Sequence, residues 1–215
     1  SEWTPLQIQL SRRFGPSKLA TCQYAAGKRH EFAMAAMALA AASQTEPGGK
    51  LPEEFLAQAI KEIVMHEVGH SLGLRHNFKA SSMLNHDQIN DPSITRVKGM
   101  SASVMDYNPI NIAPKGHKQG DYATTTIGPY DYWAIEYAYK PVEGDENAEL
   151  KKIAARSPDP DLIYATDEDL WMSDDPQVNT YDLGSDPLRY GQERMNVAAD
   201  LLKNLDEKVV RDGES

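Results

Sequence analysis

The sequence predicts an α+β fold that is predominantly helical. Several long segments are rich in helix-forming Ala, Met and Leu or repeat apolar residues at helical spacing. Strand-like patterns are short: Leu6–Leu10 alternates apolar and polar residues, and Leu162–Ala165 is a second candidate strand. The chain has 215 residues, which is enough for one domain with a working hydrophobic core, or for one domain with an appendage.

Two helices are expected in the N-terminal third. The segment Arg29–Ser43 is rich in helix formers and ends at the polar turn Gln44–Lys50, which contains Pro, Gly and Gly. Pro52 suits a first helical turn, and two acidic residues after it suit the positive end of a helix dipole. Apolar residues then recur at helical spacing, so we expect the second helix to run to about Leu72.

The elements of the C-terminal part follow turn and cap signals. Residues 79–119 lack periodicity and are rich in Asn, Asp, Ser, Pro and Gly, which predicts a long loop without regular elements. Helices are expected over Tyr130–Tyr139, over Asn147–Arg156, and from Asp186-Pro187 to near Val210, with a loop over Thr166–Asp186.

The composition argues against several classes of partner. Lys and Arg number 22 and Asp and Glu number 32, which gives a net charge of −10 with His neutral. Because phosphate contacts need clustered Lys and Arg, we expect no nucleic-acid partner. The most apolar stretch, Phe32–Ala42, falls short of the roughly 20 residues that cross a bilayer, so no membrane-spanning segment is expected. We also expect no signal peptide in this sequence.

The predicted second helix carries the motif HEVGHSLGLRH, which begins at His66. His66 and His70 are four residues apart, so their imidazoles project from one helical face and can converge on one tetrahedral zinc ion. Gly73 can adopt the positive φ that ends a helix, which would return His76 as a third ligand. Three neutral ligands leave a fourth position for water. Glu67 is then placed as a general base toward that water, whose pKa zinc lowers toward neutrality.

An alternative interpretation is that these are ordinary histidines on an amphipathic helix. Three of the six histidines, however, fall in this one motif together with the required Glu and Gly. The others, His30, His86 and His117, have no partner spacing and are expected to be solvated or hydrogen-bonded. Gly69 lies inside the helix at a cost of about 1 kcal/mol relative to Ala, which suggests close packing against a partner that the sequence does not identify.

Two other kinds of metal ligand are less favoured. The single cysteine, Cys22, excludes an intrachain disulfide; it could cap zinc as a latency thiolate, but its surroundings, ATCQY, resemble no such switch, and a buried structural thiol is expected. Carboxylates between residues 159 and 175 could bind Ca²⁺, but they lack the spacing of an EF-hand loop, so a solvated acidic surface is expected. These are Asp159, Asp161, Asp167, Glu168, Asp169, Asp174 and Asp175.

A second motif, SASVMDY, lies downstream at residues 101–107. With it, the sequence resembles the metzincin clan of zinc endopeptidases, in which the long zinc motif is followed by a turn that bears a methionine. The resemblance implies that Met105 supports the ligand histidines without binding zinc, and that Tyr107 brings its hydroxyl to the metal or to the transition-state oxyanion. The alternative roles are a core gap-filler for Met105 and a packed aromatic ring for Tyr107.

A narrower resemblance is to large bacterial zinc-dependent metalloproteases with a Met-zincin domain. It rests on HEVGHSLGLRHNF, SVMDY and IGPYDYWAIEYAY, and it covers roughly residues 50–170. It implies a zincin-like catalytic domain, in which a mixed sheet precedes the zinc helix and binds substrate at its edge. Only 65 residues precede His66, so we expect part of that sheet to be absent from this chain. Such proteases are typically exported, which implies a periplasmic, cell-surface or secreted location.

These features predict a zinc-dependent endopeptidase with one catalytic Zn²⁺ and a protein or peptide substrate. We expect an N-terminal remnant (1–50) with the candidate strand and the Ala- and Met-rich helix, a zinc-binding catalytic core (51–140), a C-terminal helical subdomain (141–215), and further domains in the full-length chain. The rival is a non-catalytic zinc-containing scaffold or peptide-binding domain, and hydrolysis of a non-peptide amide also stays open. Water at the fourth zinc position would favour the enzyme, and a fourth side chain would favour the scaffold.

Overall fold

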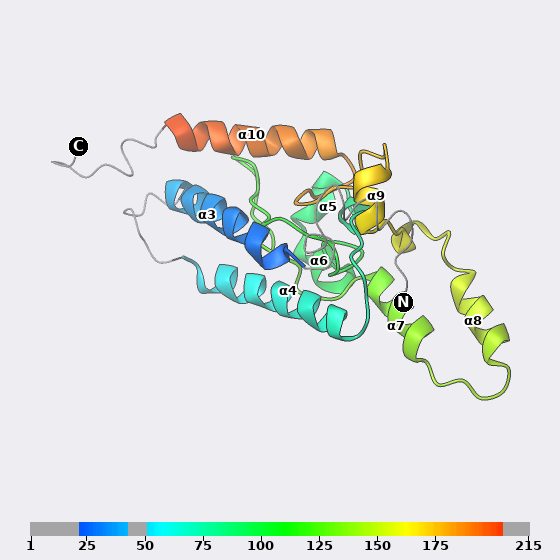
Figure 1. The fold of residues 1–215 in the computed structure, drawn as a ribbon. Helices are drawn as coiled ribbons and strands as arrows, with labels where there is room; N and C mark the ends of the chain where they lie inside the picture. The colour runs from blue at the N-terminus through cyan, green and yellow to red at the C-terminus, as the bar shows by residue number, and fades with distance from the viewer. Residues whose placement is uncertain (1–21, 43–50, 204–215) are drawn as a thin grey trace.

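The computed structural model describes residues 22–42 and 51–203, which fold as an assembly of helices (Figure 1). The elements are α3 (Tyr24–Ala42), α4 (Glu53–Ser71), a 3₁₀ turn (Ala80–Met83), α5 (His86–Ile89), α6 (Pro92–Lys98), α7 (Pro129–Tyr139), α8 (Glu146–Ala154), a 3₁₀ turn (Pro160–Leu162), α9 (Asp167–Met172) and α10 (Pro187–Lys203). The five long helices that the sequence predicts are therefore confirmed as α3, α4, α7, α8 and α10. In the described part of the chain, no helix is both long and apolar enough to span a membrane.

The predicted α+β fold class is wrong, because the described residues contain no strand. The candidate strand Leu162–Ala165 begins in a 3₁₀ turn and continues as an extended segment beside Asn77. The Asn77 side chain donates to the carbonyl of Ile163 at 2.9 Å and accepts from the amide of Ala165 at 3.1 Å. The backbone amide of Phe78 also donates to Ala165 O at 2.7 Å, so one asparagine side chain and one backbone bond hold this segment in place of a strand ladder. The other candidate, Leu6–Leu10, lies outside the described residues.

Three long helices lie side by side in the order α10, α3, α4 (Figure 1). Between α3 and α4, the Phe32 ring meets the Phe55 ring edge to face, with centroids 5.4 Å apart, and Ala59 is fully buried beside them. Between α10 and α3, Arg194 Nη2 donates to Glu31 Oε2 at 2.8 Å. Helix α3 is therefore held on both sides, which fixes the position of its N-terminal end.

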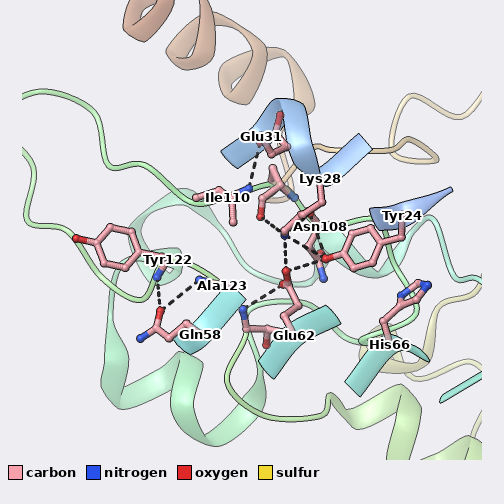
Figure 2. Close-up of polar contacts among 12 residues, drawn as sticks. Tyr24, Lys28, Glu31, Gln58, Glu62, His66, Asn108, Ile110, Tyr122 and Ala123 are labelled. Atoms are coloured by element: carbon pink, nitrogen blue, oxygen red, sulfur yellow. Dashed lines mark hydrogen bonds and ion pairs between the residues drawn. The ribbon is translucent and has the colours of Figure 1, made fainter. Parts of the chain in front are cut away.

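Helix α4 buries one face and leaves a second apolar row exposed. The buried residues are Phe55, Gln58, Ala59, Glu62, His66 and Gly69. The exposed apolar residues are Leu56, Ile60, Val64, Val68 and the C-cap Leu72, each 42–60% accessible to solvent. Polar side chains lie on the buried face because they bond the neighbouring loop. Gln58 Oε1 accepts from Tyr122 N at 2.6 Å (Figure 2), and Glu62 Oε1 accepts from Thr124 N at 3.2 Å.

Short helices interrupt both segments that are predicted as loops. In the segment 79–119, α5 begins at a capping box on Asn85, and α6 begins where the Asp91 side chain accepts from the amide of Ser93 at 2.9 Å. In the segment 166–186, the Thr166 cap begins α9. These helices depend on local caps rather than on apolar periodicity, so a search for periodicity does not find them.

Candidate metal centre

Helix α4 presents the first two histidines of the motif from one face. His66 is fully buried and His70 is half-buried, and their ring centroids lie 4.8 Å apart. This arrangement follows from their spacing, because residues four apart lie one above the other on a helix. The two rings therefore share one side of α4, close to its C-terminal end.

Gly73 has the positive φ that the sequence predicts, at +86°. A Cβ at this position would meet nothing within 4 Å, so glycine is needed for the backbone conformation and not for space. Gly73 N donates to His70 O at 2.9 Å and Leu74 N donates to Gly69 O at 3.0 Å, which is the pair of bonds of a Schellman motif. The chain then reverses direction, and His76 Nε2 lies 3.1 Å from His70 Nε2.

The second ring nitrogen of each histidine is hydrogen-bonded, which fixes the tautomer. His66 Nδ1 lies 2.7 Å from the Val104 carbonyl, and His70 Nδ1 lies 3.0 Å from the carbonyl four residues ahead. His76 Nδ1 lies 2.8 Å from Asp167 Oδ1. Because these oxygens only accept, a proton is assigned to each Nδ1, and each Nε2 is the atom that can bind a metal.

Burial and neighbouring groups set the charge of two of these rings. Burial lowers the pKa of His66 to about 3, so this imidazole is neutral, which is the form that binds metal. Burial also disfavours the charged form of His76, but hydrogen bonds to Asp167 and Cys22 outweigh it and raise the pKa of His76 to about 9. Metal binding at His76 must therefore displace a proton.

Cys22 lies beside the histidines, so the expectation of a buried structural thiol is wrong. The residue is exposed, and its Sγ is 3.4 Å from His66 Nε2. One ligand atom from each of Cys22, His66, His70 and His76 lies within 4.8 Å of all the others. Within residues 22–42 and 51–203, this is the group of side chains whose spacing suits a metal ion.

The donor set fits zinc. Imidazole nitrogen and thiolate sulfur are preferred zinc ligands, and four of them make a tetrahedral site. Zinc bond lengths place two such ligand atoms roughly 3.3–3.6 Å apart. The distances of 3.1 Å between His70 Nε2 and His76 Nε2, and of 3.4 Å between Cys22 Sγ and His66 Nε2, are close to that separation.

Glu67 and Tyr107, the predicted catalytic residues, both reach the Cys22 thiol. Glu67 is exposed on α4, and its Oε1 lies 3.8 Å from Cys22 Sγ. The Tyr107 hydroxyl donates to Cys22 Sγ at 3.6 Å and accepts from Gln23 N at 2.8 Å. Burial raises the pKa of Tyr107 well above its usual value, so its hydroxyl keeps the proton and acts as a donor.

The turn that bears Met105 packs directly against α4. Met105 is fully buried, and a Cβ on Gly69 would collide with its sulfur, which identifies the packing partner of this helical glycine. The turn is held from the other side by Asp131 of α7, whose carboxylate accepts from Val104 N at 2.9 Å. Since the Val104 carbonyl contacts His66, the turn links α7 to the histidine cluster.

Comparison with known families agrees with this geometry. The family described as Met-zincin matches residues 48–215. The chain belongs to the Met-zincin family. The match includes the histidine motif, the methionine turn and α10, and membership of the Met-zincin family supports a metalloprotease-type domain whose metal is zinc. No curated protein and no solved structure matches the chain.

The sequence does not assign three of the residues that contact the histidine cluster or the turn beside it. Asp167 is expected on a solvated acidic surface, yet it bonds His76. Asp131 lies in a segment that supports the family resemblance, which is the one signal that could have indicated it. Cys22 is considered as a zinc cap from the sequence but not favoured, and it has no spacing signal because it lies 44 residues before His66. His86 lies outside the cluster and is hydrogen-bonded as expected, with Nε2 3.1 Å from a backbone carbonyl.

Proposed function

We propose that this protein is a zinc-dependent endopeptidase in which Glu67 is the general base. The observation that carries the proposal is the convergence of three histidine side chains, with Glu67 directly after the first of them. Membership of the Met-zincin family supports the same reading. When bound, a zinc ion supplies Lewis acidity toward the scissile carbonyl and lowers the pKa of the attacking water.

The side chains around the cluster have the chemistry that peptide hydrolysis needs. The Glu67 carboxylate takes a proton from the attacking water and later delivers it to the leaving nitrogen. The Tyr107 hydroxyl, held as a donor, hydrogen-bonds the developing oxyanion. Both side chains contact the same atom, Cys22 Sγ, so both can reach a substrate group that replaces this thiol.

A non-catalytic domain with a structural zinc ion is the second candidate function, and the position of Cys22 favours it. Structural zinc sites are closed by four protein ligands, and Cys22 is placed where it could supply a fourth. Glu67 favours the enzyme, because a structural site needs no carboxylate beside its first ligand. The two functions differ in whether the protein cleaves peptide bonds once zinc is bound.

Cleavage of an unstructured protein such as casein tests the proposal. The zinc-loaded wild type is expected to cleave it, and Glu67→Gln is expected to lose activity by about 10²-fold or more while it still binds zinc. Glu53→Gln is the matched control, because Glu53 is an exposed glutamate at the other end of α4. If wild type and Cys22→Ser each bind one zinc ion and neither cleaves, the scaffold function is supported instead.

We also propose, from the family resemblance alone, that the protein acts outside the cytoplasm on a protein or peptide substrate, as part of a longer chain. Fractionation of the native host, with an antibody raised against residues 51–203, tests the location. Detection in the cytosolic fraction alone would contradict it.

A further inference from the structure

We propose that Cys22 is the fourth ligand of the metal site, and that Cys22 and Gln23 form an internal plug that must move before a substrate can bind. This inference rests on the proposed function and adds a means of regulating the same site. The Cys22 thiol is close to all three histidines: Sγ lies 3.4 Å from His66 Nε2 and within 4.8 Å of the ligand atoms of the other two.

The plug contacts both predicted catalytic residues. Cys22 Sγ lies 3.8 Å from Glu67 Oε1 and accepts from the Tyr107 hydroxyl at 3.6 Å. The backbone amide of Gln23 donates to that hydroxyl at 2.8 Å. The general base and the oxyanion donor are thus both engaged by the plug, and a water molecule or a substrate carbonyl in the same place would overlap the thiol.

A buried polar anchor holds the chain next to the plug. Figure 2 shows Tyr24 and Lys28 of α3 converging on Glu62 of α4. The Tyr24 hydroxyl donates to Glu62 Oε2 at 2.7 Å, and Lys28 forms an ion pair with the same carboxylate. Lys28 Nζ also donates to the carbonyls of Asn108 and Pro109, at 2.8 and 3.1 Å. Because the Lys28 and Glu62 side chains are almost completely buried, the first turns of α3 are firmly attached to α4.

Solvent exposure changes abruptly between the plug, which is exposed, and the first residue of the anchor, which is buried. Tyr24 is the first residue of α3 and is fully buried, with its ring stacked on Tyr107 at a centroid distance of 5.1 Å. Cys22 and Gln23 precede the helix and are exposed. Rotation of the backbone just before Tyr24 can therefore remove the plug while α3 stays packed.

Opening the site is a ligand exchange and needs no oxidant. If zinc is bound, the zinc–sulfur bond would break, a water molecule would enter as the fourth ligand, and the released thiolate would take a proton from solvent. The anchor keeps the thiol close to the histidines, so the closed arrangement is the resting state. An open metallopeptidase with three histidine ligands and a closed four-ligand zinc site are then two states of one protein.

Cobalt substitution in the full 215-residue chain tests the fourth ligand, because a cobalt–thiolate bond adds a near-ultraviolet charge-transfer absorption that cobalt–imidazole bonds lack. We expect this absorption in the wild type and in Glu67→Gln, and its loss in Cys22→Ser, which still binds Co²⁺ through the histidines. Cobalt binding by the wild type without the thiolate absorption would overturn the plug and leave the proposed function standing. Failure of the wild type to bind cobalt would overturn the metal site itself.

Alkylation by iodoacetamide tests closure independently of activity. Bound Zn²⁺ is expected to slow alkylation of Cys22 at least about tenfold, because a metal-bound thiolate is shielded. The control is Cys22→Ser combined with Lys151→Cys, which places a thiol on exposed α8, where zinc should have no effect. Equal alkylation rates of Cys22 with and without zinc would overturn the proposal.

Discussion

Gly69 is the residue on which the methionine turn depends most directly, because the Met105 sulfur lies where a Cβ would be. We expect Gly69→Ala to destabilise the protein by about 1–3 kcal/mol, although Ala is the better helix former. Gly191 of α10 is the matched control: a Cβ there meets nothing within 4 Å, so Gly191→Ala should stabilise by up to about 1 kcal/mol. Urea unfolding measures both changes, and a Gly69→Ala protein as stable as the wild type would contradict the packing.

Asp182 is a buried carboxyl group that makes stability depend on pH. Burial raises the pKa of Asp182 to about 6 from an ordinary value of 3.8. Since the folded state holds this proton more tightly, the stabilisation from this group is complete below about pH 4 and is lost as pH rises through about 6. Asp182→Asn keeps an oxygen that can accept from Ser81 Oγ, as Asp182 Oδ1 does at 3.1 Å.

We therefore expect Asp182→Asn to gain stability relative to the wild type as pH rises, by up to about 3 kcal/mol at pH 7. Urea unfolding of both zinc-loaded proteins at pH 4.5 and pH 7.5 measures the difference. Because metal binding contributes equally to both proteins, its pH dependence cancels when their free energies of unfolding are subtracted. A difference that does not change with pH would show that Asp182 has an ordinary pKa in the folded state.

At the scale of elements, α9 matters because its first residue, Asp167, orients His76. Asp167→Asn is expected to weaken zinc binding about 10–100-fold, since partners of this kind raise the basicity of a ligand imidazole and fix its orientation. Glu168→Gln is the neighbouring control, because Glu168 Oε2 instead accepts from the exposed Arg75, at 2.7 Å. Competition with a chromophoric chelator measures both affinities, and equal losses in the two variants would argue against an orienting role.

The contact between α3 and α4 contains the buried ion pair of Lys28 and Glu62. Lys28→Met should cost about 3–5 kcal/mol, because it leaves the Glu62 carboxylate buried without its partner. Adding Glu62→Leu should recover part of this loss, since both charges are then removed. Denaturant unfolding of the two variants makes the comparison. If Lys28→Met alone is as stable as the protein that also carries Glu62→Leu, the buried ion pair does not hold α3 on α4 in the way described.

Sequence patterns predict the long helices but not the elements that depend on single side chains. Composition and periodicity are sufficient for α3 and α4, because many residues contribute to each signal. The short helix α5 depends on one cap, Asn85, and the false strand at 162–165 is held by the Asn77 side chain and by one backbone bond from Phe78 N to Ala165 O. A pattern averaged over a window cannot detect such individual bonds.

At the scale of the whole molecule, the metal centre joins four separate segments. The three histidines could be predicted because they lie in one motif, where helix geometry alone brings two of them together. Cys22 comes from the segment just before α3, Val104 from the methionine turn and Asp167 from α9, and only the tertiary fold places them around the rings. The place of Cys22 in the cluster therefore could not be predicted from the sequence.

We propose that His66, His70 and His76 together hold one zinc ion, and native mass spectrometry during a zinc titration measures this binding. We predict one zinc ion per chain for the wild type and for His117→Ala, whose histidine is exposed and lies outside the cluster. His70→Ala should lose tight zinc binding, because it removes one of the converging Nε2 atoms. A wild type that binds no zinc, or a His70→Ala protein that binds it as tightly as the wild type, would contradict the claim.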